Sequence, residues 1–180
     1  MVIQYEILEE DYISFNILHQ ERSKHMKRMI LIVRCFFSFV FLYTLMLIFT
    51  TKKEIGIDSK IIPFCLLFFS LYFIIFTPRY FKYSLKKQTR KLIKEGKNDS
   101  ILGKKKLEID NEYIIESDES TETKHKWSVI EKIVETDKYI FIYASAISAY
   151  IIPKRIFNSL NEKEAFLQKI SELSNLKINC

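Results

Sequence analysis

The chain has 180 residues, rich in Phe (15) and Tyr (10) but with only three Gly and three Pro, which excludes collagen-like, low-complexity and glycine-rich phosphate-loop proteins. Its formal net charge of +6 is concentrated in a few segments. The cysteines, Cys35, Cys65 and Cys180, are odd in number and form no CxxC pair, which disfavours a disulfide framework or a zinc site.

Residues 1–28 predict a strand followed by a helix. Apolar and polar residues alternate in "IQYEIL", so that Ile3, Tyr5 and Ile7 share one face. The next stretch, "EEDYISFNILHQERSKH", predicts a helix whose first turn is acidic, where negative charge suits the helix dipole. A lone strand can neither bury its face nor pair its edge groups, so we expect strand 3–8 to join a sheet formed later in the chain.

Residues 29–78 predict a transmembrane hairpin with helices at about 29–50 and 61–77. At 1.5 Å per residue these runs reach roughly 33 Å and roughly 25 Å, against a bilayer core of about 30 Å. The alternative is a buried hairpin in a soluble protein, but a domain of this size could hardly bury two such runs on every face. A charged start without a small-residue cleavage site disfavours a signal peptide. Arg34, one turn inside the first run, is expected to reach towards the head groups, and Pro63 is expected in the first turn of the second helix.

The distribution of Lys and Arg predicts the orientation of the hairpin. Four cations precede the first helix and eight follow the second, whereas the connecting loop carries three. Because cations accumulate on the cytoplasmic side, we expect a multi-pass cell-membrane protein with cytoplasmic N- and C-termini.

A basic juxtamembrane connector, residues 79–103, follows the hairpin. Residues 79–106 hold eleven Lys and Arg against two acids, and the apolar spacing predicts that the second membrane helix continues here until about Gly96. These cations could attract anionic lipid at about 1 kcal/mol each, or serve only as a topology signal on a solvated helix face. The candidate lipid or partner contacts in this segment are Arg79, Lys82, Lys86 and Lys87.

Residues 104–180 predict a cytoplasmic antiparallel-sheet unit closed by a C-terminal helix. A hairpin turn is expected at Asp110-Asn111, an acidic turn at 117–121 and a single helical turn at 128–131. The final helix has Asn161 as its expected cap. The fold class is therefore an α+β membrane protein, and its sheet-rich unit has the outline of a pleckstrin-homology-like domain. The expected strands contain "LEI", "EYIIE", "TETKHKW", "KIVET", "YIFIY" and "AYIIP", and the apolar stripe of the helix is Phe166, Leu167, Ile170 and Leu173.

The stretch "AYIIPKRIF", residues 149–157, places a proline and two cations inside an apolar run. Proline cannot donate to a strand ladder, so Pro153 should end its strand or lie on an edge. We expect Lys154 and Arg155 to face solvent and Phe157 to return to the core. The binding alternative is that Lys154 and Arg155 form a cationic rim for phosphate groups or for the acids of a partner.

Three features together resemble the YcxB-like family of small bacterial membrane proteins. They are the N-terminal "YEILEEDYISF", the two-helix hairpin, and a C-terminal unit with "KWSVIEKIVETDKYIFIY" followed by "IIPKRIF". The resemblance covers the whole architecture and implies that Trp127, Pro153 and Phe157 mark the fold without a catalytic role. No biochemical activity is implied by the family.

The sequence favours binding over catalysis. It contains no glycine-rich phosphate loop, nucleophile elbow or metal-ligand spacing, so we expect no enzyme activity, no catalytic residue, no cofactor and no metal. Nucleic acid is a disfavoured partner, because the cations lie beside the membrane and residues 107–180 carry nine cations against thirteen acids. The first candidate function is a membrane-tethered interaction module that binds a cytoplasmic protein or an anionic lipid head group. The alternative is a self-protection (immunity) protein against a membrane-acting bacteriocin or toxin, which a neighbouring toxin gene would favour.

Overall fold

The structure of the protein is a computed structural model that describes residues 1–50, 57–95 and 101–179, with the side chains of 57–60 outside the description. The chain divides into two compact units. Met1–Asn16 and Thr89–Cys180 form the sheet unit, and Ile17–Gln88 form the hairpin unit. Helix α1 (Glu9–Arg22) begins in the sheet unit and ends in the hairpin unit, and α3 runs between the units in the opposite order.

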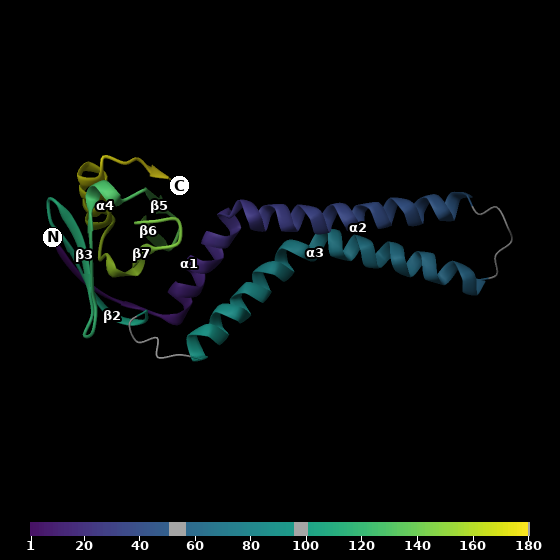
Figure 1. The fold of residues 1–180 in the computed structure, drawn as a ribbon, viewed down its shortest axis with the longest axis horizontal. Helices are drawn as coiled ribbons and strands as arrows, with labels where there is room; N and C mark the ends of the chain where they lie inside the picture. The colour runs from purple at the N-terminus through teal and green to yellow at the C-terminus, as the bar shows by residue number, and fades with distance from the viewer. Residues whose placement is uncertain (51–56, 96–100, 180) are drawn as a thin grey trace. The chain divides into compact units, whose positions relative to one another are not determined.

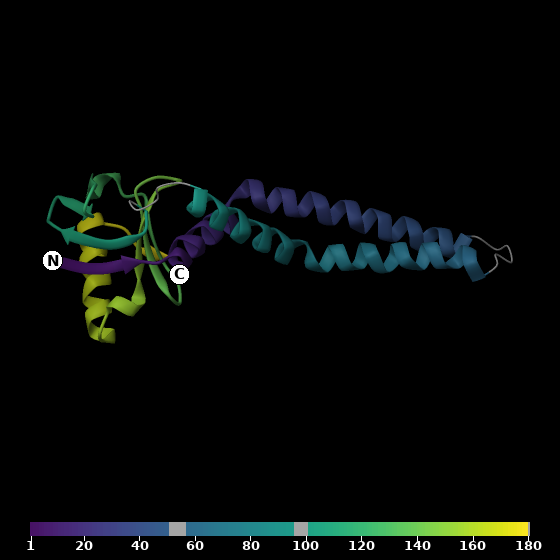
Figure 2. The same cartoon turned by 90° about the horizontal axis from the view of Figure 1, so that it is seen from below.

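The hairpin unit is built from α2 (Lys24–Thr50) and α3 (Ile57–Glu95), which lie side by side (Figures 1 and 2). Both helices are long and apolar enough to cross a membrane. Only 6% of the apolar window of α2 and 11% of that of α3 are buried, whereas the core helix of a soluble protein is mostly buried. The described hairpin therefore exposes most of its apolar surface.

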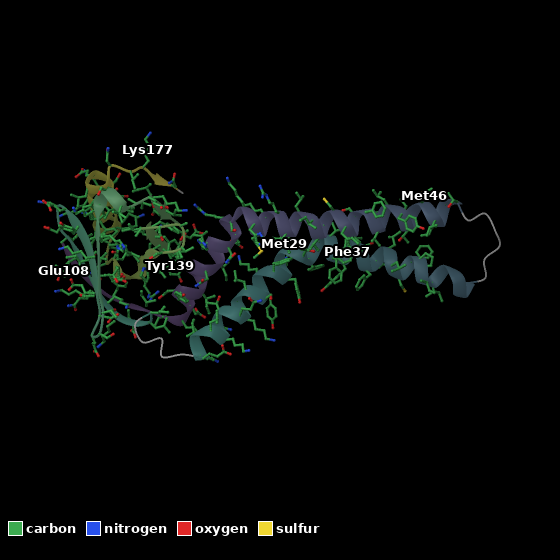
Figure 3. All side chains as sticks on the ribbon, in the orientation of Figure 1. Met29, Phe37, Met46, Glu108, Tyr139 and Lys177 are labelled. Carbon is green, nitrogen blue, oxygen red and sulfur yellow. The ribbon has the colours of Figure 1, made fainter. Side chains whose placement is uncertain are left out.

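Aromatic packing joins the two helices. The Phe37 ring stacks on Phe73 with 4.5 Å between centroids and meets Phe69 edge-on at 6.2 Å. Figure 3 labels Phe37 on the side of α2 that faces α3. The buried hydroxyls of Thr44 and Ser70 donate to carbonyls of their own helices, at 2.7 Å and 2.9 Å, so they add no unsatisfied polar group to this seam.

The limits of α3 differ from the predicted membrane helix. The helix begins at Ile57, so Pro63 lies in its second turn rather than in its first. Hydropathy marks where the apolar run begins, while backbone hydrogen bonding decides where the helix begins. The continuation into the basic connector is confirmed as far as Glu95, and the expected end near Gly96 lies outside the described residues.

The first sheet of the sheet unit has the order β1-β2-β3-β4 and is antiparallel throughout. Strand β1 pairs with β2 although the whole hairpin lies between them in the chain, and Tyr5 lies opposite Lys105 and Ile3 opposite Leu107. Figures 1 and 2 show purple β1 beside teal β2. The prediction that the N-terminal strand joins the later sheet is confirmed. The strands are β1 (Val2–Ile7), β2 (Gly103–Ile109), β3 (Tyr113–Ser117) and β4 (Glu122–Lys126).

The second sheet has the order β7-β6-β5-β8. Its three long strands, β5 (Lys132–Glu135), β6 (Tyr139–Tyr143) and β7 (Ala149–Pro153), are antiparallel and match the predicted strands. The two-residue β8 (Ile178–Asn179) pairs in parallel with β5 and was not predicted. Two short 3-10 turns, η1 (Trp127–Val129) and η2 (Lys154–Ile156), and the closing helix α4 (Leu160–Ser174) complete the unit.

The core of the sheet unit includes the start of α1. The Phe15 ring lies 5.7 Å from Phe141 and 5.9 Å from Tyr143, centroid to centroid. Trp127 is 4% exposed, and its indole nitrogen donates to the Asp110 carbonyl at 2.8 Å. Half-buried Phe157 packs on Phe166 of α4 at 5.3 Å. From α4 itself the core takes Phe166, Leu167 and Ile170, three of the four residues of the predicted stripe.

The N-cap of α4 is Ser159, so the prediction of Asn161 was wrong. The Ser159 hydroxyl accepts from the Glu162 backbone N–H at 3.2 Å, and the Glu162 carboxylate accepts from the Asn158 N–H at 2.8 Å. The sequence offers two overlapping cap-x-x-Glu spacings, Ser159 to Glu162 and Asn161 to Glu164. The earlier one is used, which lengthens the helix at its start.

Candidate functional site

The predicted Pro-Lys-Arg site lies where β7 ends. Pro153 is the last residue of β7, an edge strand, as expected from its missing N–H. Lys154 does not face solvent as predicted. Its side chain is 19% exposed, and its Nζ lies 2.6 Å from Oε1 of Glu135 at the end of β5. The same carboxylate oxygen lies 3.2 Å from Nζ of Lys163 on α4, so Lys154 takes part in an ion-pair cluster that joins sheet and helix.

Arg155 keeps 45% of its side chain exposed, but its guanidinium is bound within the fold. Its two Nη atoms donate to the Asp11 carboxylate at 2.7 Å and 2.6 Å, and Nη2 also donates to the Glu6 carbonyl at 2.8 Å. Asp11 is 1% exposed. Burial alone would raise the pKa of the Asp11 carboxyl, but hydrogen bonds from Arg155 and from the Leu8 N–H outweigh burial and lower the pKa below its ordinary value. Arg155 therefore joins β7 to the N-terminal segment.

These contacts favour the structural role of the Pro-Lys-Arg stretch. A phosphate group would have to compete with Glu135 for Lys154 and with Asp11 for Arg155. Lys154 also holds the pKa of the Glu135 carboxyl below its ordinary value, against the opposing effect of burial. The binding role of Lys154 and Arg155 stays a prediction.

The candidate cations of the connector lie in the hairpin unit, on the later turns of α3. Arg79 lies over the Phe76 ring at 5.6 Å, and Nζ of Lys82 lies 3.0 Å from Oε1 of Glu21 on α1. Lys86 and Lys87 are exposed. Since Lys154 and Arg155 belong to the sheet unit, the two predicted groups of cations do not form one site within either unit.

A further site borders the predicted acidic turn, where two hollows of about 550 Å³ and about 570 Å³ adjoin. They share Lys104, Asp118 and Glu119 in their linings. Gly103, which lines one of them, has φ of +93°, a backbone conformation that favours glycine where the chain enters β2. We call these adjoining hollows the turn groove. Its other lining residues are Gln4, Tyr5, Glu6, Leu102, Lys105, Lys106, Ser117 and Ser120.

Buried ionic contacts fix the floor of the turn groove. Nζ of Lys105 lies 2.5 Å from the Asp118 carboxylate, with only 4% and 7% of the two side chains exposed. The Lys105 hydrogen bond, together with backbone donors from Ser120 and Thr121, holds the pKa of Asp118 well below its ordinary value. The turn is therefore pre-organised by hydrogen bonds on both sides of Asp118.

A second buried pair lies beside the first. The Tyr5 hydroxyl donates to Oε1 of Glu116 at 2.5 Å. Burial raises the pKa of the Glu116 carboxyl, and the Tyr5 hydrogen bond and the Lys105 charge offset this only in part. On the next strand, Nδ1 of His125 lies 2.6 Å from the Tyr150 hydroxyl of β7. Polar groups thus line the inner side of the first sheet at this end.

The acidic turn was predicted from the sequence, but this network of buried contacts was not. One signal was present: alternation in "KKKLEI" places Lys105 on the same side as Leu107 and Ile109, which are core positions. A lysine at an inward position needs an acid as partner, and Asp118 was the nearest candidate across the hairpin. Within the described residues, no group of three or more His, Cys, Asp or Glu side chains could hold a metal ion.

Comparison with known proteins agrees with the sequence resemblance. The model of the YcxB-like protein family matches residues 109–170, about one third of the chain, from the end of β2 into α4. The chain has no match among the curated proteins or among the solved structures. The matched range contains Trp127, Pro153 and Phe157, the residues that the resemblance implies as markers of the fold. Over residues 109–170 this chain is therefore similar to the YcxB-like proteins.

Proposed function

We propose that this protein is a membrane-tethered interaction module. Its hairpin spans the cell membrane with both termini in the cytoplasm, and its sheet unit is a pleckstrin-homology-like domain that binds a protein segment in the turn groove. Two four-stranded sheets closed by α4 support the domain assignment. Two exposed apolar helices support the membrane span.

The observation that carries the tethering role is the position of the hairpin within the domain. It is inserted between β1 and β2, which are neighbours in one sheet. The chain therefore leaves the sheet unit along α1 and returns to it along α3, so the domain is joined to the hairpin by two segments of the chain. Such an attachment suits a module that presents a binding surface beside a membrane.

The charges of the turn groove favour a protein segment over a lipid head group. Its exposed cations are Lys104 and Lys106, while Glu6 and Glu119 are exposed acids. An anionic head group would meet these carboxylates, but a peptide with side chains of both signs could pair with both kinds of charge. Lys154 and Arg155 are already paired with Glu135 and Asp11, which also favours a protein segment over a lipid head group.

Site-specific photo-crosslinking tests this function in the full-length protein in its native membrane. A benzophenone side chain placed at Glu119 samples the turn groove, and one at exposed Glu164 on α4 is the matched control. We expect a discrete protein adduct from position 119, absent from position 164 and weakened by Lys104→Glu. An identical adduct from both positions, or adducts with lipid alone, would contradict protein binding at the groove. Removal of the protein from membranes by an alkaline carbonate wash would contradict the tether.

A further inference from the structure

Helix α3 contains a proline at a place where apolar surface surrounds it. Pro78 has no backbone N–H, so it cannot donate to the carbonyl of Ile74, four residues earlier. Figure 1 shows α3 bent along its length, as expected when a proline interrupts the helical ladder. In a membrane no water is present to satisfy the carbonyl that the proline leaves open.

Arg34 of α2 supplies the missing donor. Its Nε donates to the Ile74 carbonyl at 3.0 Å. Arg34, the charged residue of the first apolar run, thus replaces the backbone donor that Pro78 removes from α3. The sequence predicts that Arg34 reaches towards head groups, and the structure adds that the Nε of its guanidinium is held against α3. That hydrogen bond fixes the plane of the guanidinium fork.

Most of the hydrogen-bonding capacity of Arg34 remains. A guanidinium carries five N–H donors, of which Nε has one, and across the described ranges the Nη groups of Arg34 have no hydrogen-bond partner. The side chain is exposed. A charged group among apolar helices is costly unless it finds an acceptor of opposite charge. Arg34 therefore presents a fixed, bidentate donor pair to whatever surrounds the hairpin.

A small hollow of about 70 Å³ lies one helical turn from the contact between Arg34 and Ile74, and its lining does not include Arg34. It is lined by Ile30, one turn before Arg34 on α2, and by Pro78, one turn after Ile74 on α3. Helical side chains lean towards the N-terminus of their own helix, so Arg34 leans towards Ile30 and the hollow. Lys82, one turn beyond Pro78, also lines the hollow, and its Nζ is paired there with Oε1 of Glu21 at 3.0 Å. The remaining lining is mostly apolar: Ile17, Met26, Phe81 and Leu85, with Gln20 and Glu21.

We propose that Arg34 binds the phosphate of an anionic phospholipid, with its Nη groups bonding two phosphate oxygens and the exposed apolar faces of α2 and α3 contacting the lipid below its head group. The inference rests on the proposed membrane span. A lipid fits because the helices around Arg34 are exposed along their apolar windows. A net-negative lipid fits better than a zwitterionic one, because a choline ammonium would be repelled by the excess of Lys and Arg near this end of the hairpin.

The test measures lipid preference around the full-length protein. The protein is placed in phosphatidylcholine vesicles, and the association of spin-labelled phosphatidylglycerol is compared with that of spin-labelled phosphatidylcholine. Arg34→Gln should lower the preference for phosphatidylglycerol by about tenfold, the worth of hydrogen bonds to a charged group. The control is Arg28→Gln, an exposed cation on the same helix outside the hollow lining. At high salt the general attraction is screened, so the control should lose its effect while Arg34→Gln keeps its own.

Equal losses in the two variants at high salt would overturn the site. Excess inorganic phosphate should leave the preference unchanged, and loss of the preference would show a free-anion site instead of a lipid site. Because Arg34→Gln leaves the Ile74 carbonyl without a donor, the pair Pro78→Ala and Pro78→Ala/Arg34→Gln provides a second comparison. Pro78→Ala restores the helical N–H, so both proteins keep a satisfied helix, and equal preference in this pair would also overturn the site. Failure to enter vesicles contradicts the membrane span itself, whereas entry without an Arg34-dependent preference overturns only the lipid site.

Discussion

Asp11 and Arg155 lie 144 positions apart, yet the contact between them joins the two ends of the sheet unit. Asp11 is almost fully buried, so its charge depends on Arg155 and on the Leu8 N–H for stabilisation. Removing one partner of such a pair leaves the other charged and buried, which costs more than the pair itself contributes. Arg155 is half-exposed, which reduces this cost, because water can reach the carboxylate once the guanidinium is gone.

Arg155→Ala should therefore destabilise the sheet unit by about 2–3 kcal/mol. Lys154→Ala is the matched control and should cost only about 1 kcal/mol, because Glu135 keeps Lys163 as a partner. The measurement is denaturant unfolding of the full-length protein in detergent, followed by fluorescence of Trp127, the one tryptophan of the sequence.

The pH dependence gives an independent check on the same contact. The pKa of Asp11 is lowered in the folded state. The ionised carboxylate therefore stabilises the fold fully at pH values above the ordinary pKa of aspartate, and this stabilisation is lost as the pH falls through the folded-state pKa. Arg155→Ala should flatten this loss of stability in acid. An unfolding midpoint and acid profile equal to those of the unchanged protein would show that the contact does not hold the two ends together.

The residue scale also shows what sequence reasoning can reach. The position of Pro153 follows from one missing N–H, and the burial of Trp127 follows from its size and its place beside strands. The partner of Arg155 could not be found in this way, because strand and helix patterns repeat over a few residues and contain no information on a contact across 144 positions. The choice of Ser159 over Asn161 as cap was open for a different reason, since both residues satisfy the same local rule.

At the scale of elements, a side chain of α2 compensates for a missing backbone hydrogen bond in α3. Pro78 leaves the Ile74 carbonyl of α3 without a backbone donor, and Arg34 of α2 donates to that carbonyl instead. If this hydrogen bond is the main structural role of Arg34, replacing Arg34 should destabilise the hairpin only slightly when α3 lacks Pro78.

A double-mutant cycle tests this coupling. Arg34→Gln alone should destabilise the hairpin by about 1–3 kcal/mol, because the Ile74 carbonyl loses its donor in apolar surroundings. In a Pro78→Ala background the same change should cost clearly less, since position 78 then supplies a backbone N–H. Reversible unfolding of the hairpin in bilayers would measure both costs. Strictly additive effects would mean that Arg34 does not serve the carbonyl opened by Pro78.

Elements were predictable where a periodic pattern was long enough. Strands β1 to β7 follow from alternation and turn residues, and the two long helices follow from hydropathy. Strand β8 has two residues and no period of its own, so only the β5 edge beside it gives it a partner. The hidden Lys105–Asp118 pair was missed because a charged residue on an inward face contradicts the pattern by which strands are recognised.

For the whole molecule, the pairing of β1 with β2 sets a condition on topology. The two strands exchange backbone hydrogen bonds in one sheet, and the hairpin lies between them in the chain. Both ends of the hairpin must therefore lie on the same side of any membrane that it crosses. A soluble fragment of residues 101–180 would lack β1 and expose its partner edge on β2, so experiments on binding need the full chain.

The side itself is predicted by the cations, twelve around the hairpin ends against three in its connecting loop. In a background in which all three natural cysteines are replaced, Ser59→Cys should react with a membrane-impermeant thiol reagent in intact cells. Asn98→Cys should react only after permeabilisation, because it follows the second helix on the cytoplasmic side. The reverse pattern would place the sheet unit outside the cell. Labelling of both positions from one side would mean that the loop and the sheet unit are not separated by a membrane, which contradicts the span. Because strand pairing already requires both hairpin ends to share a side, the expected pattern at these two positions fixes the N-terminus in the cytoplasm as well.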